Sequence, residues 1–209
     1  MIVAIDGPAG AGKSTVARAA AVALGFTYLD TGAMYRCVAL ARLRDPRVDI
    51  AALEIVLGDR VLLDGEDVTQ AIREPQVSEG ASLVAVDPEI RGAMVERQRV
   101  LLAAGDCVAE GRDIGTVVAP HADLKVFLTA DPDERARRRA AQTGQSVDEV
   151  LAEQADRDER DRERATSPLT AAPDAVIVDT SAETLQDVVD RIVRLVDGLL
   201  AAPTPGSLP

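Results

Sequence analysis

The segment Gly7–Ser14 constrains this chain more than any other feature of its sequence. It reads Gly-Pro-Ala-Gly-Ala-Gly-Lys-Ser and fits the pattern G-x-x-x-x-G-K-[ST] at every fixed position. An apolar run, Met1–Ile5, precedes it, and an alanine-rich segment, Ser14–Leu24, follows it. A strand, a glycine-rich loop and a helix in this order form the setting that the pattern requires. The sequence therefore predicts a phosphate-binding loop.

Each residue type in this loop has a chemical reason. Glycine lets backbone N–H groups curve around an anion because it has no Cβ. The amino end of the following helix adds partial positive charge. Lys13 is expected to reach the β- and γ-phosphates of ATP, and the Ser14 hydroxyl is expected to ligate Mg²⁺. The residues expected to bind the donor are Gly7, Pro8, Ala9, Gly10, Ala11, Gly12, Lys13, Ser14 and Thr15.

The charge balance limits the kinds of partner. With 23 Lys and Arg residues against 35 Asp and Glu residues, the formal net charge is −12, which argues against non-specific binding to nucleic acid. No apolar run reaches the ~18 residues of a membrane span, and no signal peptide precedes the first strand. Cys37, Cys107 and His121 form no metal or disulfide pattern. We expect a cytoplasmic protein without a nucleic-acid or membrane partner.

Short apolar strands separated by helices are expected along the chain. Five such strands are expected to end near Ile5, Leu29, Glu110, Leu128 and Asp179. Their few alternating patterns favour a parallel sheet that is covered by helices on both faces. The expected fold class is α/β, with a five-stranded parallel sheet of the P-loop NTPase type. Ligands of such sheets collect at the carboxyl ends of the strands, so the loops there should meet at one edge.

The chain is expected to form one domain with two additions. The polar segment 45–78 is too short for a core of its own and is expected to be an insert. The arginine-rich segment 141–168 lies between the fourth and fifth strands, where a mobile cover, or lid, can be inserted. The remaining segments are the core, 1–44, 79–140 and 169–200, and a flexible Pro-rich tail, 201–209.

Arginine residues suggest that a second anion binds in front of the donor phosphates held by the loop. Arg36 and Arg112 each follow the end of a strand. On a helix, Arg157, Asp161 and Arg164 fall at positions i, i+4 and i+7, on one face. A solvated helix of alternating charge is the alternative explanation for this last run.

The same arginines indicate the type of acceptor. An acceptor phosphate is already an ionised nucleophile, so catalysis requires alignment and neutralisation of charge rather than a general base. Arginine suits this task because its planar fork grips phosphate oxygens and stays charged. The sequence offers many arginines and no convincing base. It therefore favours a kinase for a phosphate acceptor over one for a hydroxyl acceptor.

Several stretches resemble the bacterial cytidylate (CMP) kinases, which belong to the nucleoside monophosphate kinases. Ser82 and Arg91 match as well, and the resemblance spans nearly the whole chain up to Asp179. The order of the stretches is far more specific than the phosphate loop alone. They are IDGPAGAGKST at 5–15, LDTGAMYR at 29–36, GEDVTQAIREPQVS at 65–78, AEGRDIGTVV at 109–118 and DERDRERATSPL at 158–169.

The resemblance implies a reaction and an acceptor base. ATP would phosphorylate CMP and dCMP in pyrimidine nucleotide metabolism, with Mg²⁺ bridging the donor β- and γ-phosphates. Segment 45–78 would be the monophosphate-binding insert, and Arg157–Arg164 would lie in the lid. Ser82, Arg91 and Asp113 would read cytosine. A carboxylate can accept from the exocyclic amine of cytosine, which uracil lacks, so UMP should be rejected.

The resemblance also implies roles at the phosphates and the sugar. Thr31, Arg36 and Arg112 would lie near the acceptor phosphate. Arg157 and Asp161 would lie at the acceptor sugar, and Arg164 would reach phosphate. The implied catalytic residues are Lys13, Arg112, Arg157 and Arg164, and Arg135 and Arg139 would contact the donor adenine and phosphates. Glu110 would either help to hold Mg²⁺ through water or be a structural acceptor. A monomer is expected.

Three alternatives remain open from the sequence. The chain could be another small P-loop kinase, acting on UMP, AMP or a metabolite hydroxyl. A GTP-binding switch protein would need Asn-Lys-x-Asp and Asp-x-x-Gly elements, but the chain has no asparagine and no glycine three positions after an aspartate. A degenerate relative without activity is disfavoured because Lys13, Ser14 and the arginines are all present.

Overall fold

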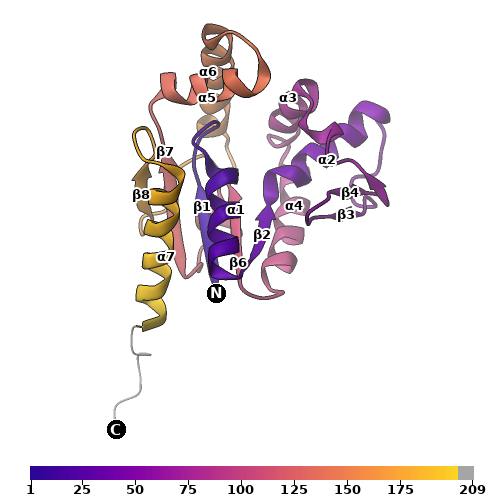
Figure 1. Ribbon diagram of the computed structural model, residues 1–209. Helices are drawn as coiled ribbons and strands as arrows, with labels where there is room; N and C mark the ends of the chain where they lie inside the picture. The colour runs from indigo at the N-terminus through magenta and orange to yellow at the C-terminus, as the bar shows by residue number, and fades with distance from the viewer. Residues whose placement is uncertain (202–209) are drawn as a thin grey trace.

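A five-stranded parallel sheet forms the centre of the protein, for which a computed structural model describes residues 1–201 (Figure 1). All four pairings in the sheet are parallel. The expected α/β fold of the P-loop kinase type is confirmed. In spatial order the strands are β2 (Thr27–Asp30), β6 (Cys107–Gly111), β1 (Ile2–Asp6), β7 (Leu124–Thr129) and β8 (Val176–Asp179).

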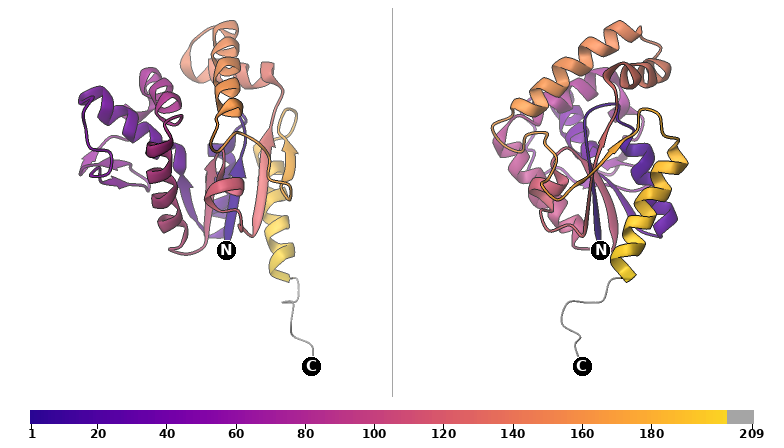
Figure 2. Two further views of the ribbon diagram at one scale, coloured as in Figure 1. Left: turned by 180° about the vertical axis from the view of Figure 1, so that it is seen from behind. Right: turned by 90° about the vertical axis from the view of Figure 1, so that its left-hand side faces the viewer.

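Helices bury both faces of this sheet. Val3 and Ile5 of β1 pack against α1 (Lys13–Leu24) and α7 (Leu185–Ala201), which lie together on one side in the right-hand view of Figure 2. Ala4 points to the other face, toward α4 (Pro88–Leu102) and the π-helical turn η2 (Ile114–Val118). Successive side chains of a strand point to opposite faces, so a strand that is covered on both sides must be apolar throughout.

Two helices follow strand ends directly. Helix α1 starts after Gly12 and ends at Gly25, which adopts a left-handed conformation that glycine tolerates well. Helix α2 (Thr31–Arg44) starts one residue after β2, and the Asp30 side chain caps it by accepting a hydrogen bond from the Ala33 N–H at 2.9 Å. Thr31 and Gly32 form the first turn of this helix because Asp30 is its N-cap.

The segment expected to be an insert contains a small antiparallel sheet. Its strands are β3 (Ile55–Val56), β4 (Leu62–Leu63) and β5 (Glu66–Asp67), and the 3₁₀ turn η1 (Ala71–Arg73) follows them. Its apolar side chains share a core with α2, α4 and α3 (Pro75–Val84). They therefore pack against helices outside 45–78, so this core extends beyond the predicted insert. The buried residues include Val38, Leu63, Val68, Ile72, Val77 and Met94.

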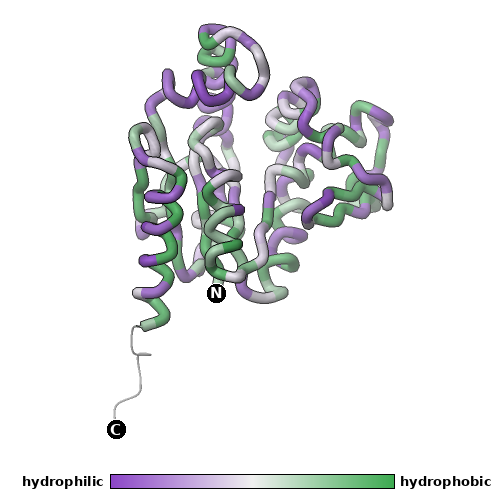
Figure 3. Tube along the Cα trace, viewed as in Figure 1, coloured by the Kyte–Doolittle hydropathy of each residue, from purple (hydrophilic) through white to green (hydrophobic). Residues whose placement is uncertain are grey.

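Two helices lie over the end of the sheet that carries the phosphate loop, as Figure 1 shows. They are α5 (Pro132–Thr143) and α6 (Val147–Glu163). Ser146 begins α6 with a capping box that pairs it with Glu149. In Figure 3, α5 is mostly hydrophilic, whereas the strands are largely hydrophobic. The predicted lid thus consists mainly of one capped, highly charged helix.

The carboxyl end of the described chain belongs to α7, which continues through Ala201. Ala201, expected in the flexible tail, is helical, and the rest of that predicted tail, 202–209, lies outside the described residues. Within residues 1–201, no helix has the length and apolarity needed to cross a membrane.

Candidate active site

The phosphate loop joins β1 to α1 and presses against neighbouring backbone. A Cβ at Gly7 would lie 2.1 Å from the Leu128 carbonyl oxygen, and one at Gly10 would lie 2.7 Å from Nε2 of Gln154. Both residues also have positive φ angles, 151° and 77°. Gly7 therefore requires glycine for space as well as for backbone conformation, because the neighbouring atom belongs to the backbone, and Gly10 requires it for backbone conformation.

Lys13 is buried at the start of α1. Its Nζ donates to the Pro8 carbonyl oxygen at 2.7 Å, so the side chain folds back over the loop. Burial, together with the positive charge of Arg112, lowers the pKa of Lys13 to about 7. A phosphate bound beside Lys13 would raise this pKa again and favour the charged ammonium form. The position is therefore well suited to bind an anion.

Asp6, the last residue of β1, is a residue that the sequence analysis missed. Its carboxylate accepts from the backbone N–H groups of Ile114 at 2.9 Å and Gly115 at 2.7 Å. Burial nevertheless raises the pKa of Asp6 to about 6. The contact ties the strand before the phosphate loop to the turn that carries Asp113. An acidic residue at the end of an apolar strand was the available signal in the sequence.

Glu110 lies beside the phosphate loop at the end of β6. It is buried and accepts a hydrogen bond from the Tyr28 hydroxyl. Burial and the nearby Asp30 raise the pKa of Glu110, while Lys13 and hydrogen bonds from Tyr28 and Ser14 oppose that rise. The Thr31 hydroxyl donates to the Glu110 carbonyl oxygen at 2.6 Å. The ends of β1, β2 and β6 therefore meet, as expected for this edge of the sheet.

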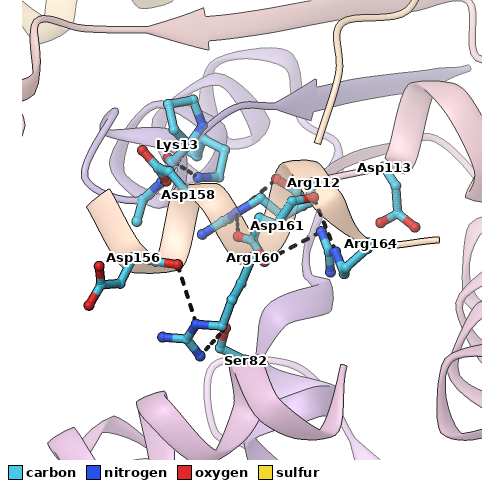
Figure 4. Close-up of polar contacts among 12 residues, drawn as sticks. Lys13, Ser82, Arg112, Asp113, Asp156, Asp158, Arg160, Asp161 and Arg164 are labelled. Atoms are coloured by element: carbon cyan, nitrogen blue, oxygen red, sulfur yellow. Dashed lines mark hydrogen bonds and ion pairs between the residues drawn. The ribbon is translucent and has the colours of Figure 1, made fainter. Parts of the chain in front are cut away.

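Several arginines converge on the same edge. Arg36 Nη2 lies 2.6 Å from Asp30 Oδ2, and Arg112 Nε donates to Asp161 Oδ2 at 3.0 Å. Burial lowers the pKa of Arg157 to about 10, and Arg112 acts in the same direction. Figure 4 shows Arg112, Asp161 and Arg164 grouped beside Lys13 where α6 crosses the site.

These arginines have hydrogen-bonding capacity to spare. Within residues 1–201, the buried N–H groups without a hydrogen-bond partner include three in this cluster, Arg36 Nε, Arg157 Nε and Arg164 Nη2, besides Arg135 Nε and Gln98 Nε2 elsewhere. Arg164 Nη2 is 3.5 Å from Asp161 Oδ1 but makes no hydrogen bond. Buried donors are normally satisfied in folded proteins. The cluster is therefore organised to receive an anion with several oxygen atoms.

Of the three residues expected to read a base, two form a buried pair. Arg91 Nη1 donates to Asp113 Oδ2 at 2.8 Å, and its Nε donates to the Ala85 carbonyl oxygen at 2.9 Å. The Arg91 guanidinium also lies over the Tyr35 ring, 5.3 Å from its centroid. Ser82 instead contacts the lid, because its hydroxyl accepts from Arg160 Nη1 at 3.1 Å.

The two arginines of α5 differ from each other. Arg135 Nη1 donates to Asp158 Oδ2 at 2.6 Å and to the Ala9 carbonyl oxygen at 2.8 Å. Its guanidinium thus links α6, in the predicted lid, to the phosphate loop. The Arg139 side chain makes no hydrogen bond or ion pair within residues 1–201. Asp158 and Arg160, which face these partners, were not singled out from the sequence because alternating charge hides which residues point inward.

A phosphate loop opposed by buried arginines, on a parallel sheet with a charged lid helix, defines a P-loop kinase, a phosphotransferase. A shikimate kinase from Bacteroides thetaiotaomicron shares this fold, with a TM-score of 0.53 and 15% identity over 94% of this chain and 98% of that structure.

The cytidylate kinase family model matches residues 3–198, and the chain belongs to this family. It is 49% identical to a cytidylate kinase of Solibacter usitatus, over 94% of this chain and 92% of that relative. It is 50% identical to a cytidylate kinase of Pelotomaculum thermopropionicum, over 93% of this chain and 95% of that relative.

Proposed function

We propose that this chain transfers the γ-phosphoryl group of ATP directly to a phosphate oxygen of CMP or dCMP, giving ADP and CDP or dCDP. Family membership supports the reaction with CMP. The observation that carries the site assignment is the set of unpartnered guanidinium N–H groups beside Lys13. Buried N–H donors that are left without a hydrogen-bond acceptor are costly, and an anion with several oxygen atoms would supply acceptors for them.

The donor phosphates are assigned to the phosphate loop. The backbone N–H groups of Gly7–Thr15 and the ammonium group of Lys13 would bind them, as loops of this kind do. Lys13 would move from the Pro8 carbonyl to phosphate oxygens and hold positive charge where negative charge develops during transfer.

Mg²⁺ is the proposed metal, held by the Ser14 hydroxyl. No group of three or more His, Cys, Asp or Glu side chains within residues 1–201 forms a metal site. This suits Mg²⁺, which in phosphate-transferring sites binds one or two protein oxygens and takes its other ligands from phosphates and water. When bound, Mg²⁺ would neutralise charge on the donor phosphates. The Glu110 carboxylate lies near enough to the Ser14 hydroxyl for that hydroxyl to lower its pKa, and it would help to orient the hydroxyl.

The acceptor phosphate is assigned to the arginine cluster. Thr31, Arg36 and Arg112 would position it, and Arg164 would reach it from the lid. Arg157 and Asp161 would contact the sugar. No general base is needed because the acceptor oxygen is already ionised, so these groups contribute alignment and charge neutralisation.

The base is assigned to the buried pair of Arg91 and Asp113 together with Ser82. Asp113 Oδ2 is occupied by Arg91, which fixes the orientation of the carboxylate and leaves its second oxygen to accept from the cytosine amine. A uracil carbonyl at the same place has no proton to donate, so it would face that carboxylate without a hydrogen bond. Discrimination against UMP follows from this unpaired arrangement.

Residues 45–78 as an insert and 141–168 as a lid would exclude water from the donor. The protein is proposed to be a monomer, and light scattering on the purified protein would test that state.

The test of the function is a coupled assay with ATP, Mg²⁺ and a panel of CMP, dCMP, UMP and AMP. We expect CMP and dCMP to be phosphorylated with the highest kcat/KM. Equal rates with UMP and CMP would remove the role given to Asp113, and a preference for AMP would overturn the assigned acceptor.

A further inference from the structure

Helix α6 contacts both sides of the site through neighbouring residues. Asp158 accepts from the Ala9 N–H of the phosphate loop at 3.3 Å, and Asp161 accepts from Arg112 at 3.0 Å. Arg160, between them, reaches the opposite side and donates to Ser82 of α3, as Figure 4 shows. The lid helix is therefore anchored on the donor side and on the acceptor side at once.

The position of Arg160 on α6 places it with the inward-facing residues. It follows Arg157 by three positions and precedes Arg164 by four, so all three lie on one side of the helix. Arg162, in contrast, is exposed and has no hydrogen bond or ion pair within the part of the chain that the structure describes. The run of alternating charge thus contains arginines of two kinds, and only the inward kind contacts other elements.

The partner of Arg160 is buried and has few alternatives. Ser82 is 4% exposed, and its hydroxyl accepts from Arg160 Nη1 at 3.1 Å. Within residues 1–201, this is the single hydrogen bond between α6 and α3. A serine side chain chooses among three staggered rotamers. A guanidinium group is a donor only, so this contact selects the rotamer in which Oγ faces the lid and occupies one lone pair of that oxygen.

We propose that Arg160 is a positioning residue for base selection, which fixes the Ser82 hydroxyl so that its remaining hydrogen-bonding capacity meets the acceptor base when the lid is closed. The proposal rests on the role proposed above for Ser82. It adds that the lid senses the base as well as the phosphates and the sugar. A base that hydrogen-bonds to the Ser82 hydroxyl stabilises the closed lid through Arg160. A base that makes no such bond leaves the hydrogen bond between Arg160 and Ser82 weaker.

A purely local explanation is available for Arg160. Its Nε also donates to the Asp156 carbonyl oxygen at 3.3 Å on its own helix, as a solvated arginine can. That explanation predicts no dependence on the acceptor base. The two explanations therefore differ in base discrimination, which a general change in lid stability would not alter.

The experiment is a double-mutant cycle with Arg160→Ala, Ser82→Ala and the combination. kcat and KM are measured for CMP and UMP with saturating ATP and Mg²⁺. We expect Arg160→Ala to lower the CMP-to-UMP ratio of kcat/KM about five- to tenfold, mainly through KM for CMP, which is the effect of losing one typical hydrogen bond. The combined variant should have the same ratio as Ser82→Ala alone, because Arg160 acts through Ser82.

Two further variants complete the test. Arg160→Lys keeps a donor and should recover part of the ratio, whereas Arg162→Ala removes an exposed charge from the same helix and should leave the ratio unchanged. An unchanged ratio in Arg160→Ala, with a lowered ratio in Ser82→Ala, would overturn the proposal and keep the function of Ser82. An unchanged ratio in Ser82→Ala would overturn the proposed base site itself. Additive effects of the two substitutions would show that Arg160 does not act through Ser82.

Discussion

Arg135 on α5 and Asp158 on α6 form a buried ion pair, with Nη1 and Oδ2 2.6 Å apart, and both residues also bond to Ala9 of the phosphate loop. The family resemblance implies that Arg135 contacts the donor nucleotide, and this stays a prediction. In the structure its guanidinium joins α6, in the predicted lid, to the backbone of the loop that is proposed to hold the donor phosphates. A change at this pair should therefore alter the lid and the loop together.

Asp158→Ala should destabilise the protein because it leaves the Arg135 charge buried without its partner. Breaking a buried pair in this way costs about 3 kcal/mol or more. We expect the loss in urea unfolding and in faster amide hydrogen exchange along α6. Asp156→Ala, at an exposed position of the same helix, is the matched control and should behave like the natural sequence.

The double variant Arg135→Met with Asp158→Leu separates the two roles of this pair. Apolar replacement of a buried pair is often neutral or stabilising, so stability should return while the bonds to Ala9 stay lost. The KM for ATP should then remain raised. Full stability in Asp158→Ala would contradict the assignment of a tightly coupled pair.

Asp113→Asn should weaken CMP selectively. The amide keeps the shape of the side chain but removes the negative charge that faces Arg91 and the cytosine amine. We expect kcat/KM for CMP to fall about a hundredfold or more and that for UMP to fall much less, because sites that hydrogen-bond a substrate discriminate strongly. Initial rates with both nucleotides measure this, and unchanged kinetics with CMP would show that Asp113 does not read the base.

ATP binding at pH 8 should be accompanied by proton uptake. Burial and Arg112 lower the pKa of Lys13 to about 7, so at pH 8 its amine is largely neutral before ATP binds. Donor phosphates favour the charged form and raise this pKa, so the amine takes up about one proton at most. Calorimetry in buffers of different ionisation enthalpy measures the uptake.

The Lys13→Met variant is the control for this measurement. It should lose the uptake at pH 8, and its kcat should fall by several orders of magnitude. At pH 5 the lysine of the natural sequence is already charged, so uptake through Lys13 should be absent there. Equal uptake in the variant and the natural sequence would assign the proton to another group.

Asp6 should make stability depend on pH in the acidic range. Its pKa is raised by burial from 3.8 to about 6 in the folded protein. The folded state therefore binds the proton more tightly than the unfolded state, and this contribution is complete below about pH 4. It is lost as pH rises to about 6, and it amounts to roughly 3 kcal/mol.

The Asp6→Asn variant tests this dependence by urea unfolding at pH 4, 5, 6 and 7. The difference in free energy of unfolding between the variant and the natural sequence should change over this range. Asp148→Asn, at an exposed position, should keep the natural dependence. A difference that stays constant from pH 4 to pH 7 would show that Asp6 does not titrate in this range.

Local patterns allowed much of this molecule to be predicted. The phosphate loop and the five strands depend on consecutive residues, so their types and approximate bounds could be read directly. The small strand β3 was missed because two residues carry no periodic signal. The start of α2 is also hard to read locally, because the Thr31-Gly32 pair resembles a loop, whereas Asp30 caps a helix that begins there.

Sequence by itself determined that a phosphate loop follows the first strand and that arginines are concentrated near later strand ends, since both are local properties. Tertiary structure alone decided which of these charges meet. Asp6 meets a turn 108 residues away, Arg135 meets Asp158, and Ser82 meets Arg160. The reason is that burial on both faces of the sheet fixes how the helices lie, and only their final orientation selects the partner of each buried charge.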